Sequence, residues 1–153
     1  MMAPLRTQDL PSLVGTKLEP TEWFEITQDR VNRFAEATDD FQFIHVDAER
    51  AAKTPFGGTI AHGYLTLSLL PVLTSESGVR PEDAVMTINY GSDGFRFLAP
   101  VRVGKRVRLC RKIVDAHERK QGQWLVKTAV TIEIEGEETP AMTGEFLALY
   151  VTD

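Results

Sequence analysis

The chain has 153 residues, of which 42% are hydrophobic and 25% are charged, and its formal net charge is −5. This length is typical of one domain, so we predict a single domain over residues 1–153, and the composition is too apolar for intrinsic disorder. The negative charge gives no general attraction to nucleic acid or to an anionic membrane surface, which excludes those two classes of partner.

Helical patterns occupy the first half of the chain. Residues 27–38 place apolar side chains on one helical face, and Thr27 is the predicted N-cap. A second, shorter helical turn is predicted to begin at Asp47, whose own side chain caps it. From Gly63 to about Leu73 apolar residues point in every direction, which predicts a central helix that is surrounded on all sides. Pro71 should kink or stop this helix.

After Pro81 the chain is rich in β-branched and aromatic residues, which favours strands. Clusters of Pro, Gly and Asp predict loops at 54–58, 75–83 and 91–94. Within 124–134 the even-numbered residues are apolar or Thr, so one face of that strand should be buried. The predicted strands are Lys17–Phe24, Val85–Tyr90, Gly94–Leu98, Lys105–Ala116, Trp124–Glu135 and Thr143–Val151. The fold class is therefore α+β, with an antiparallel sheet wrapped around a buried central helix in the hot-dog arrangement.

Cysteine and histidine are scarce. Cys110 is the only cysteine, which excludes an intrachain disulfide and favours a reducing, cytoplasmic location. The three histidines form no Cys-x-x-Cys or His-Glu-x-x-His pattern, so we predict no metal site. The N-terminal segment lacks a continuous apolar run, and the longest apolar stretch, 60–73, is too short to cross a bilayer. We therefore expect neither an export signal nor a membrane anchor.

One carboxylate and one imidazole stand out beyond the first predicted helix. Asp39 and Asp40 follow directly on its C-terminal end, where the helix already carries partial negative charge, although Asp is also a common residue of helix-ending turns. His45 has an ordinary alternative as a half-buried histidine bonded to a nearby carbonyl. Together, Asp40 and His45 can converge on one water molecule across the bend, as general acid–base chemistry on water requires.

A glycine opens the predicted central helix. The free N–H groups of a helix N-terminus, with no Cβ at Gly63 to obstruct approach, can bind a developing oxyanion. The alternative is that Gly63 only permits close packing there. We assign the preceding residue, His62, to capping or packing.

Three segments carry a family resemblance: DFQFIHVD at 40–47, PFG at 55–57 and IAHGYL at 60–65. They resemble the MaoC-like dehydratases, including the (R)-specific enoyl-CoA hydratases, and the resemblance runs from about residue 34 to 103. In that family the aspartate and histidine of an Asp-x-Asn-Pro-x-His pattern hold and activate water, and a glycine N–H binds the oxyanion. The resemblance thus places these catalytic roles on Asp40, His45 and Gly63. Gln42 and Phe43 depart from the usual Asn and Pro, and a Gln is tolerated in the NodN-like branch.

The resemblance implies an (R)-specific enoyl-CoA hydratase that is a homodimer, takes an acyl-CoA thioester as substrate and needs no cofactor. A hot-dog acyl-CoA thioesterase and a non-catalytic acyl-thioester binding module are the alternatives. The segment from His62 to Ser75 contains no acidic residue, which disfavours a thioesterase. A basic group could attract the phosphates of coenzyme A, but we interpret most of it as a solvated strand face. Its members are Arg102, Lys105, Arg106, Arg108, Arg111 and Lys112.

Overall fold

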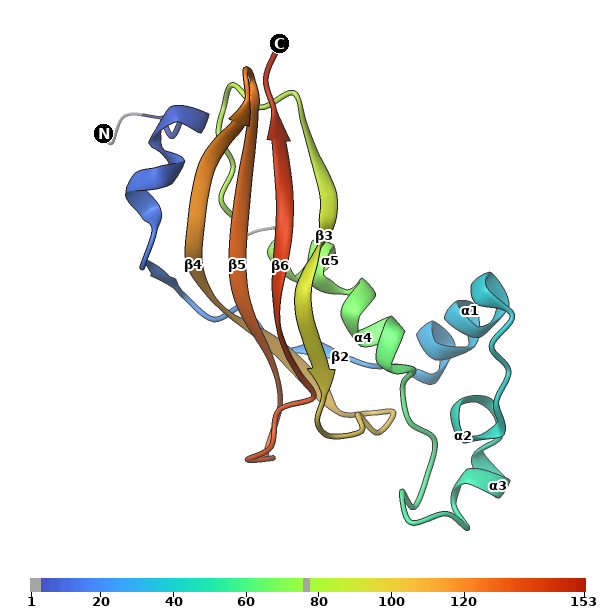
Figure 1. The fold of residues 1–153 in the computed structure, drawn as a ribbon. Helices are drawn as coiled ribbons and strands as arrows, with labels where there is room; N and C mark the ends of the chain where they lie inside the picture. Colours follow the sequence, from blue (N-terminus) through green and yellow to red (C-terminus); the bar gives the residue numbers. More distant parts are fainter. Residues whose placement is uncertain (1–3, 76–77) are drawn as a thin grey trace.

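The computed structural model describes residues 4–75 and 78–153, and a curved antiparallel sheet dominates it (Figure 1). The strand order is β1-β4-β5-β6-β3, and β2 also pairs with β4. Each pairing is antiparallel, as predicted. The strands are β1 (Lys17–Leu18), β2 (Phe24–Glu25), β3 (Met86–Phe97), β4 (Arg106–Lys120), β5 (Gln123–Ile134) and β6 (Met142–Val151).

Short helices precede the long strands, and two predicted caps are confirmed. The side chain of Thr27 accepts a hydrogen bond from the N–H of Arg30 at 3.2 Å, and Asp47 accepts one from the N–H of Arg50 at 3.0 Å. Caps of this kind each contribute about 0.5–2 kcal/mol. The helices are the 3₁₀ helix η1 (Thr7–Leu13), α1 (Gln28–Thr38), α2 (Phe43–Val46), α3 (Ala48–Ala51), α4 (Gly63–Ser68) and α5 (Leu70–Thr74).

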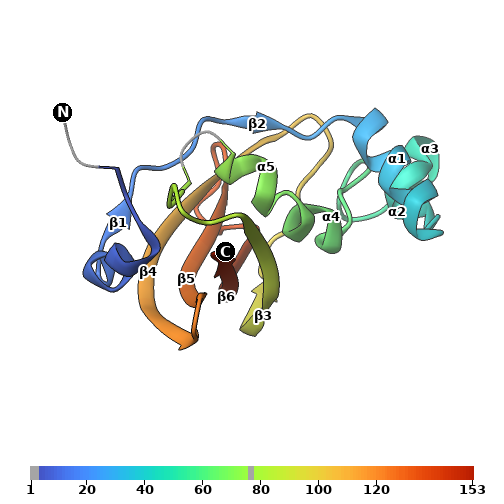
Figure 2. The same ribbon diagram turned by 90° about the horizontal axis from the view of Figure 1, so that it is seen from above.

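The predicted central helix forms as two pieces, α4 and α5, which lie against the concave side of the sheet (Figure 2). Pro71 stands in the first turn of α5, so the expected interruption by this residue is confirmed. Leu65, Leu69 and Leu73 are buried in the main core cluster. The prediction of a helix surrounded on all sides is wrong for the single chain, because Tyr64 is 65% exposed and Val72 is 44% exposed.

Two strand predictions are corrected. The predicted loop at 91–94 is wrong, since β3 runs without interruption through it and pairs with β6 along its length. The register of β3 against β6 shifts between Asn89 and Gly91 and again between Ser92 and Gly94. At each shift β3 has one extra residue, as in a β-bulge, so the strand continues through the segment. A continuous strand over 17–24 is also wrong: only β1 and β2 form there, because Pro20 between them has no N–H to donate to a ladder.

The alternation predicted for the segment 124–134 is confirmed. Four of its even-numbered residues are buried, whereas the odd-numbered residues of the strand are only partly covered. The buried four are Val126, Val130, Ile132 and Ile134. Val130, Ile132 and Ile134 belong to the main core cluster with α4 and α5, whereas Val126 belongs to a second cluster with Leu10 of η1. The convex face of the sheet is left to solvent.

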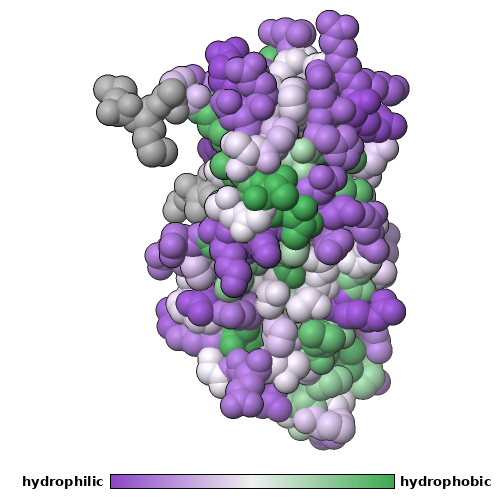
Figure 3. Space-filling model, turned by 60° about the vertical axis from the view of Figure 1, so that its left-hand side comes forward, coloured by the Kyte–Doolittle hydropathy of each residue, from purple (hydrophilic) through white to green (hydrophobic). Residues whose placement is uncertain are grey.

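The predicted solvated face of basic residues is confirmed in part. Lys105, Arg106 and Arg108 form ion pairs with glutamates of the neighbouring β-strand and its following turn, at positions 137, 135 and 133. Arg111 is only 7% exposed, so this residue departs from the prediction. On the face shown in Figure 3, polar side chains cover most of the surface and apolar ones form smaller, separate groups.

No helix within the described residues is long and apolar enough to span a membrane. Residues 1–3 of the N-terminal segment and residues 76–77 of the predicted loop 75–83 lie outside the described part of the chain.

Candidate active site

A left-handed turn places Asp40 beside the short helices. Helix α1 ends at Thr38, and its C-cap, Asp39, has φ 58°. Asp tolerates this conformation better than most residues do. The N–H of Asp40 donates to the carbonyl of Ala35 at 3.2 Å, and its carboxylate accepts a 3.4 Å hydrogen bond from the N–H of Gln42. The carboxylate is therefore exposed at the end of α1 and lightly held.

His45 lies on α2 and is buried. Its Nδ1 lies 2.7 Å from the carbonyl oxygen of Ile60, and because a carbonyl only accepts, Nδ1 carries the proton of this hydrogen bond. In the neutral ring Nε2 is then an unprotonated base. Burial is the main cause that lowers the pKa of His45; the carbonyl of Ile60 opposes it, His62 adds to the lowering and Asp40 opposes it. The environment thus favours the neutral, basic form.

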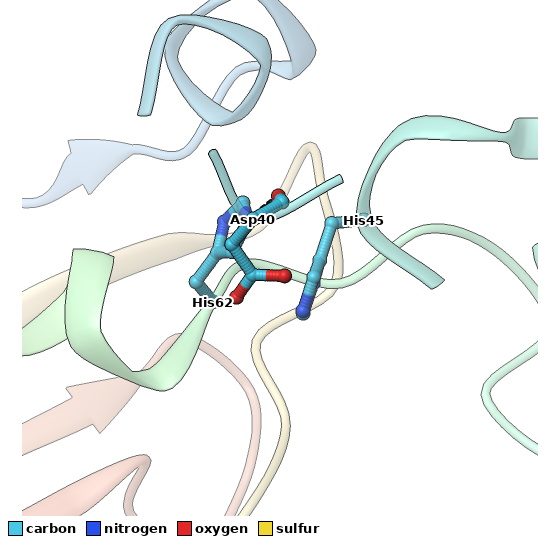
Figure 4. A group of neighbouring side chains, drawn as sticks. All are labelled: Asp40, His45 and His62. Atoms are coloured by element: carbon cyan, nitrogen blue, oxygen red, sulfur yellow. Dashed lines mark hydrogen bonds between the residues drawn. The ribbon is translucent and has the colours of Figure 1, made fainter. Parts of the chain in front are cut away.

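The structure brings the predicted acid and imidazole together and adds a second histidine (Figure 4). One carboxylate oxygen of Asp40 and one ring nitrogen each of His45 and His62 all lie within 4.8 Å of one another. One water molecule can bridge such a gap with two hydrogen bonds of ordinary length. The ring of His62 stacks on that of His45, with centroids 3.8 Å apart and an interplanar angle of 24°.

This cluster has donor atoms that could hold a metal ion, but its geometry suits proton transfer better. In a metal site the lone pairs of the ligands converge on one point. Stacked imidazole rings direct their lone pairs side by side instead, and Nδ1 of His45 and Nε2 of His62 already bond to carbonyl oxygens.

Gly63 is the first residue of α4, where backbone N–H groups have no acceptor within the helix. The ring of Phe97 on β3 packs directly against it: a Cβ built on Gly63 would lie 2.9 Å from Cε2 of that ring. The close packing considered as the alternative role of Gly63 is therefore present. Its role in binding an oxyanion stays a prediction.

The sequence patterns missed Gln28, which ties His45 to its surroundings. The side-chain amide of Gln28 donates to the carbonyl of His45 at 2.8 Å and to Asn32 at 2.9 Å, and it accepts from the hydroxyl of Thr59 at 2.6 Å. Gln28 stands 17 residues before His45, so no local spacing connects them. His62 was assigned to capping or packing; its side chain makes no cap hydrogen bond, and it packs inside the cluster.

A sheet of this order, curved around a central helix, defines a hot-dog fold. The solved (R)-hydratase from A. caviae involved in PHA biosynthesis has the same fold, with a TM-score of 0.71 and 28% identity over 88% of this chain and 94% of that chain.

Residues 9–135 of this chain match the family model of the MaoC like domain. Nodulation protein N of Rhizobium meliloti (strain 1021) is 44% identical over 149 residues, covering 97% of this chain and 92% of that protein. The 3-hydroxyacyl-thioester dehydratase Z of Mycobacterium tuberculosis (strain H37Rv) is 44% identical over 147 residues, 94% of each chain. The chain therefore belongs to the MaoC-like dehydratase family, and it is a hydro-lyase.

Proposed function

We propose that the protein adds water reversibly to a trans-2-enoyl-CoA to give the (R)-3-hydroxyacyl-CoA. The observation that carries this proposal is the approach of the Asp40 carboxylate to the neutral imidazole of His45, within 4.8 Å. The substrate class is supported by the relative named a 3-hydroxyacyl-thioester dehydratase, and the stereochemistry by the structural relative named an (R)-hydratase.

The reaction requires attack at C3, a proton at C2 and stabilisation of negative charge on the thioester oxygen. In our proposal Asp40 and His45 hold one water molecule. Nε2 of His45 accepts a proton as the hydroxide adds to C3, and the protonated pair returns one proton to C2, so both groups end as they began. The N–H of Gly63 faces the thioester oxygen. These steps consume only water and the enoyl thioester and transfer no electrons to a cofactor, so they require no flavin or nicotinamide. Asp40, His45 and the N–H of Gly63 supply the proton transfer and charge stabilisation without calling on a metal.

We also propose that two copies of the chain form a homodimer through β3. Within the described residues β3 pairs only with β6, so its other edge is open to a second strand. Several large apolar residues on and beside this strand are 42–53% exposed. They are Val85, Met86, Ile88, Tyr90, Phe97 and Leu98. A second copy paired along β3 would cover this apolar surface.

The test is product analysis with purified protein and trans-2-enoyl-CoA of several chain lengths. We expect hydration to an (R)-3-hydroxyacyl-CoA, with no release of free thiol above the uncatalysed rate. An (S) product would reject the proposed stereochemistry. Release of thiol faster than hydration would indicate a thioesterase, and binding without either reaction would indicate a binding module. The same enoyl chains on acyl carrier protein, assayed in parallel, show which carrier is preferred.

A further inference from the structure

Neither capping nor ordinary packing explains why position 62 is a histidine. The side chain of His62 is buried, with the residue only 3% exposed, and it makes no cap hydrogen bond to α4. Its Nδ1 has no hydrogen-bond partner among the described residues. An apolar ring would fill the same space without burying an unsatisfied nitrogen, which is unfavourable. The imidazole must therefore offer something that an apolar ring lacks.

The other ring nitrogen of His62, Nε2, supplies a hydrogen-bond donor, which an apolar ring lacks. Nε2 of His62 lies 3.0 Å from the backbone carbonyl oxygen of Asp40, and since that oxygen can only accept, Nε2 is the donor. One face of the ring lies on His45, and the ring of Phe34 contacts it at a tilt of 55°. His62 is thus in contact with both members of the proposed acid–base pair, through its N–H on one side and its ring face on the other.

Asp40 depends on such a contact more than His45 does. His45 has a hydrogen bond at its ring and another at its carbonyl. Asp40 is exposed, follows a left-handed residue, and has one long contact at its carboxylate. Its backbone is held by two hydrogen bonds, from its N–H to Ala35 and from Nε2 of His62 to its carbonyl. Removal of the second bond frees the peptide that orients the carboxylate.

We propose that His62 is a positioning residue for the hydration reaction: its Nε2–H holds the backbone of Asp40 so that the carboxylate stays beside the imidazole of His45. This inference rests on the proposed function of Asp40 and His45. Among the described residues, the ionisable groups clustered with His62 are those same two residues, and the ring of Phe34, which is uncharged, also contacts it.

Two substitutions separate the donor from the ring. His62→Gln retains an N–H donor near the position of Nε2 but removes the stacked ring, and His62→Phe retains the ring but removes the donor. We expect His62→Phe to lower kcat about 10-fold to 100-fold, as loss of a positioned acid–base geometry does, while KM changes less than about three-fold. We expect His62→Gln to retain kcat within about five-fold of the wild type.

His117 provides the matched control, because it is exposed on β4 and bonds to Asp115, outside the candidate site. His117→Gln and His117→Phe should leave kcat and KM unchanged. Thermal unfolding of each variant checks the fold. His62→Phe no longer buries a bare nitrogen but loses the hydrogen bond to Asp40, so the two effects oppose each other and its unfolding temperature should stay near that of the wild type.

A wild-type rate in well-folded His62→Phe would overturn the inference, and so would an equal loss of kcat in His62→Gln and His62→Phe. ¹⁵N NMR of the histidines in the unsubstituted protein gives an independent test, which holds even if a variant fails to fold. We expect the proton on Nε2 of His62 and on Nδ1 of His45; a proton on Nδ1 of His62 with a bare Nε2 would also overturn the inference. If Asp40→Asn retains activity, the proposed function of the pair fails instead.

Discussion

At the scale of single residues, the proposed mechanism depends on Asp40 and His45 acting as one unit. We expect Asp40→Asn and His45→Gln each to reduce the hydration rate by roughly 10²–10³-fold, and the double variant to add little further loss. Steady-state kinetics on a trans-2-enoyl-CoA measures this. Asp39→Asn is the matched control, since Asp39 is exposed beside Asp40 and Asn also tolerates a positive φ. A near wild-type rate in either well-folded single variant contradicts the assignment.

The buried imidazole also predicts a pH dependence. Because burial lowers the pKa of His45 below its ordinary value of 6.5, the ring stays neutral into mildly acidic solution. We expect the acidic limb of the pH–rate profile to lie below pH 6.5 and to reflect this residue. NMR titration of the His45 ring identifies the group. A limb at or above the ordinary histidine value would show that burial does not govern the titration.

The same shift affects stability. The unfolded chain binds a proton at His45 at a higher pH than the folded chain does, so the unfolded state holds more protons in the window between the two pKa values. The free energy of unfolding should therefore be unaffected by this group above the unfolded pKa and should decrease as the pH falls from there to the folded pKa. Denaturant unfolding of the wild type and of His45→Gln across that window isolates the contribution, which should be absent in the variant.

At the scale of elements, the contact between α4 and β3 decides how Gly63 is tested. A methyl group at Gly63 meets the ring of Phe97, so Gly63→Ala should reduce the free energy of unfolding by about 1–3 kcal/mol as well as lower the hydration rate. Phe97→Leu in the same chain makes room for the methyl group. We expect the double variant to regain stability, measured by denaturant unfolding. It should remain slow, because the methyl group at position 63 still obstructs the approach of the thioester oxygen to the N–H.

Phe97→Leu alone is the control for this pair of substitutions, and it should retain both folding and turnover. If the double variant regains turnover along with stability, the missing side chain at position 63 serves packing between α4 and β3 and is not needed to admit the thioester oxygen.

The elements also show what a sequence can predict. Helix α1 and the turn at Asp47 were predictable because their caps are local, within three residues of the N–H groups that they satisfy. The path of β3 through Gly91 and Gly94 was not predictable from the sequence, because these residues pair with positions of β6 that are more than fifty residues away. Gln28 was missed for a similar reason, whereas the spacing of Asp40 and His45 placed a carboxylate and an imidazole at one bend, as the structure has them.

At the scale of the whole molecule, the exposed apolar edge predicts a dimer in solution. Ile88 lies on β3 and is 43% exposed, so Ile88→Asp places a charge in the proposed interface and should shift the protein towards the monomer. Sedimentation of the wild type and the variant measures this. Val14→Asp is the matched control, because Val14 is 45% exposed next to η1, away from β3. A monomeric wild type would contradict the proposed dimer.

Helices α2 and α3 are single turns that lie at one end of the molecule, away from the strands (Figure 1). Helices of that length do not persist alone, whereas β4, β5 and β6 share the main core. The acid–base pair therefore belongs to a region whose opening costs less free energy than unfolding of the whole sheet. On heating, catalysis should disappear while the strands are still paired, and a melting curve recorded on the sheet would overstate the temperature range over which the enzyme works.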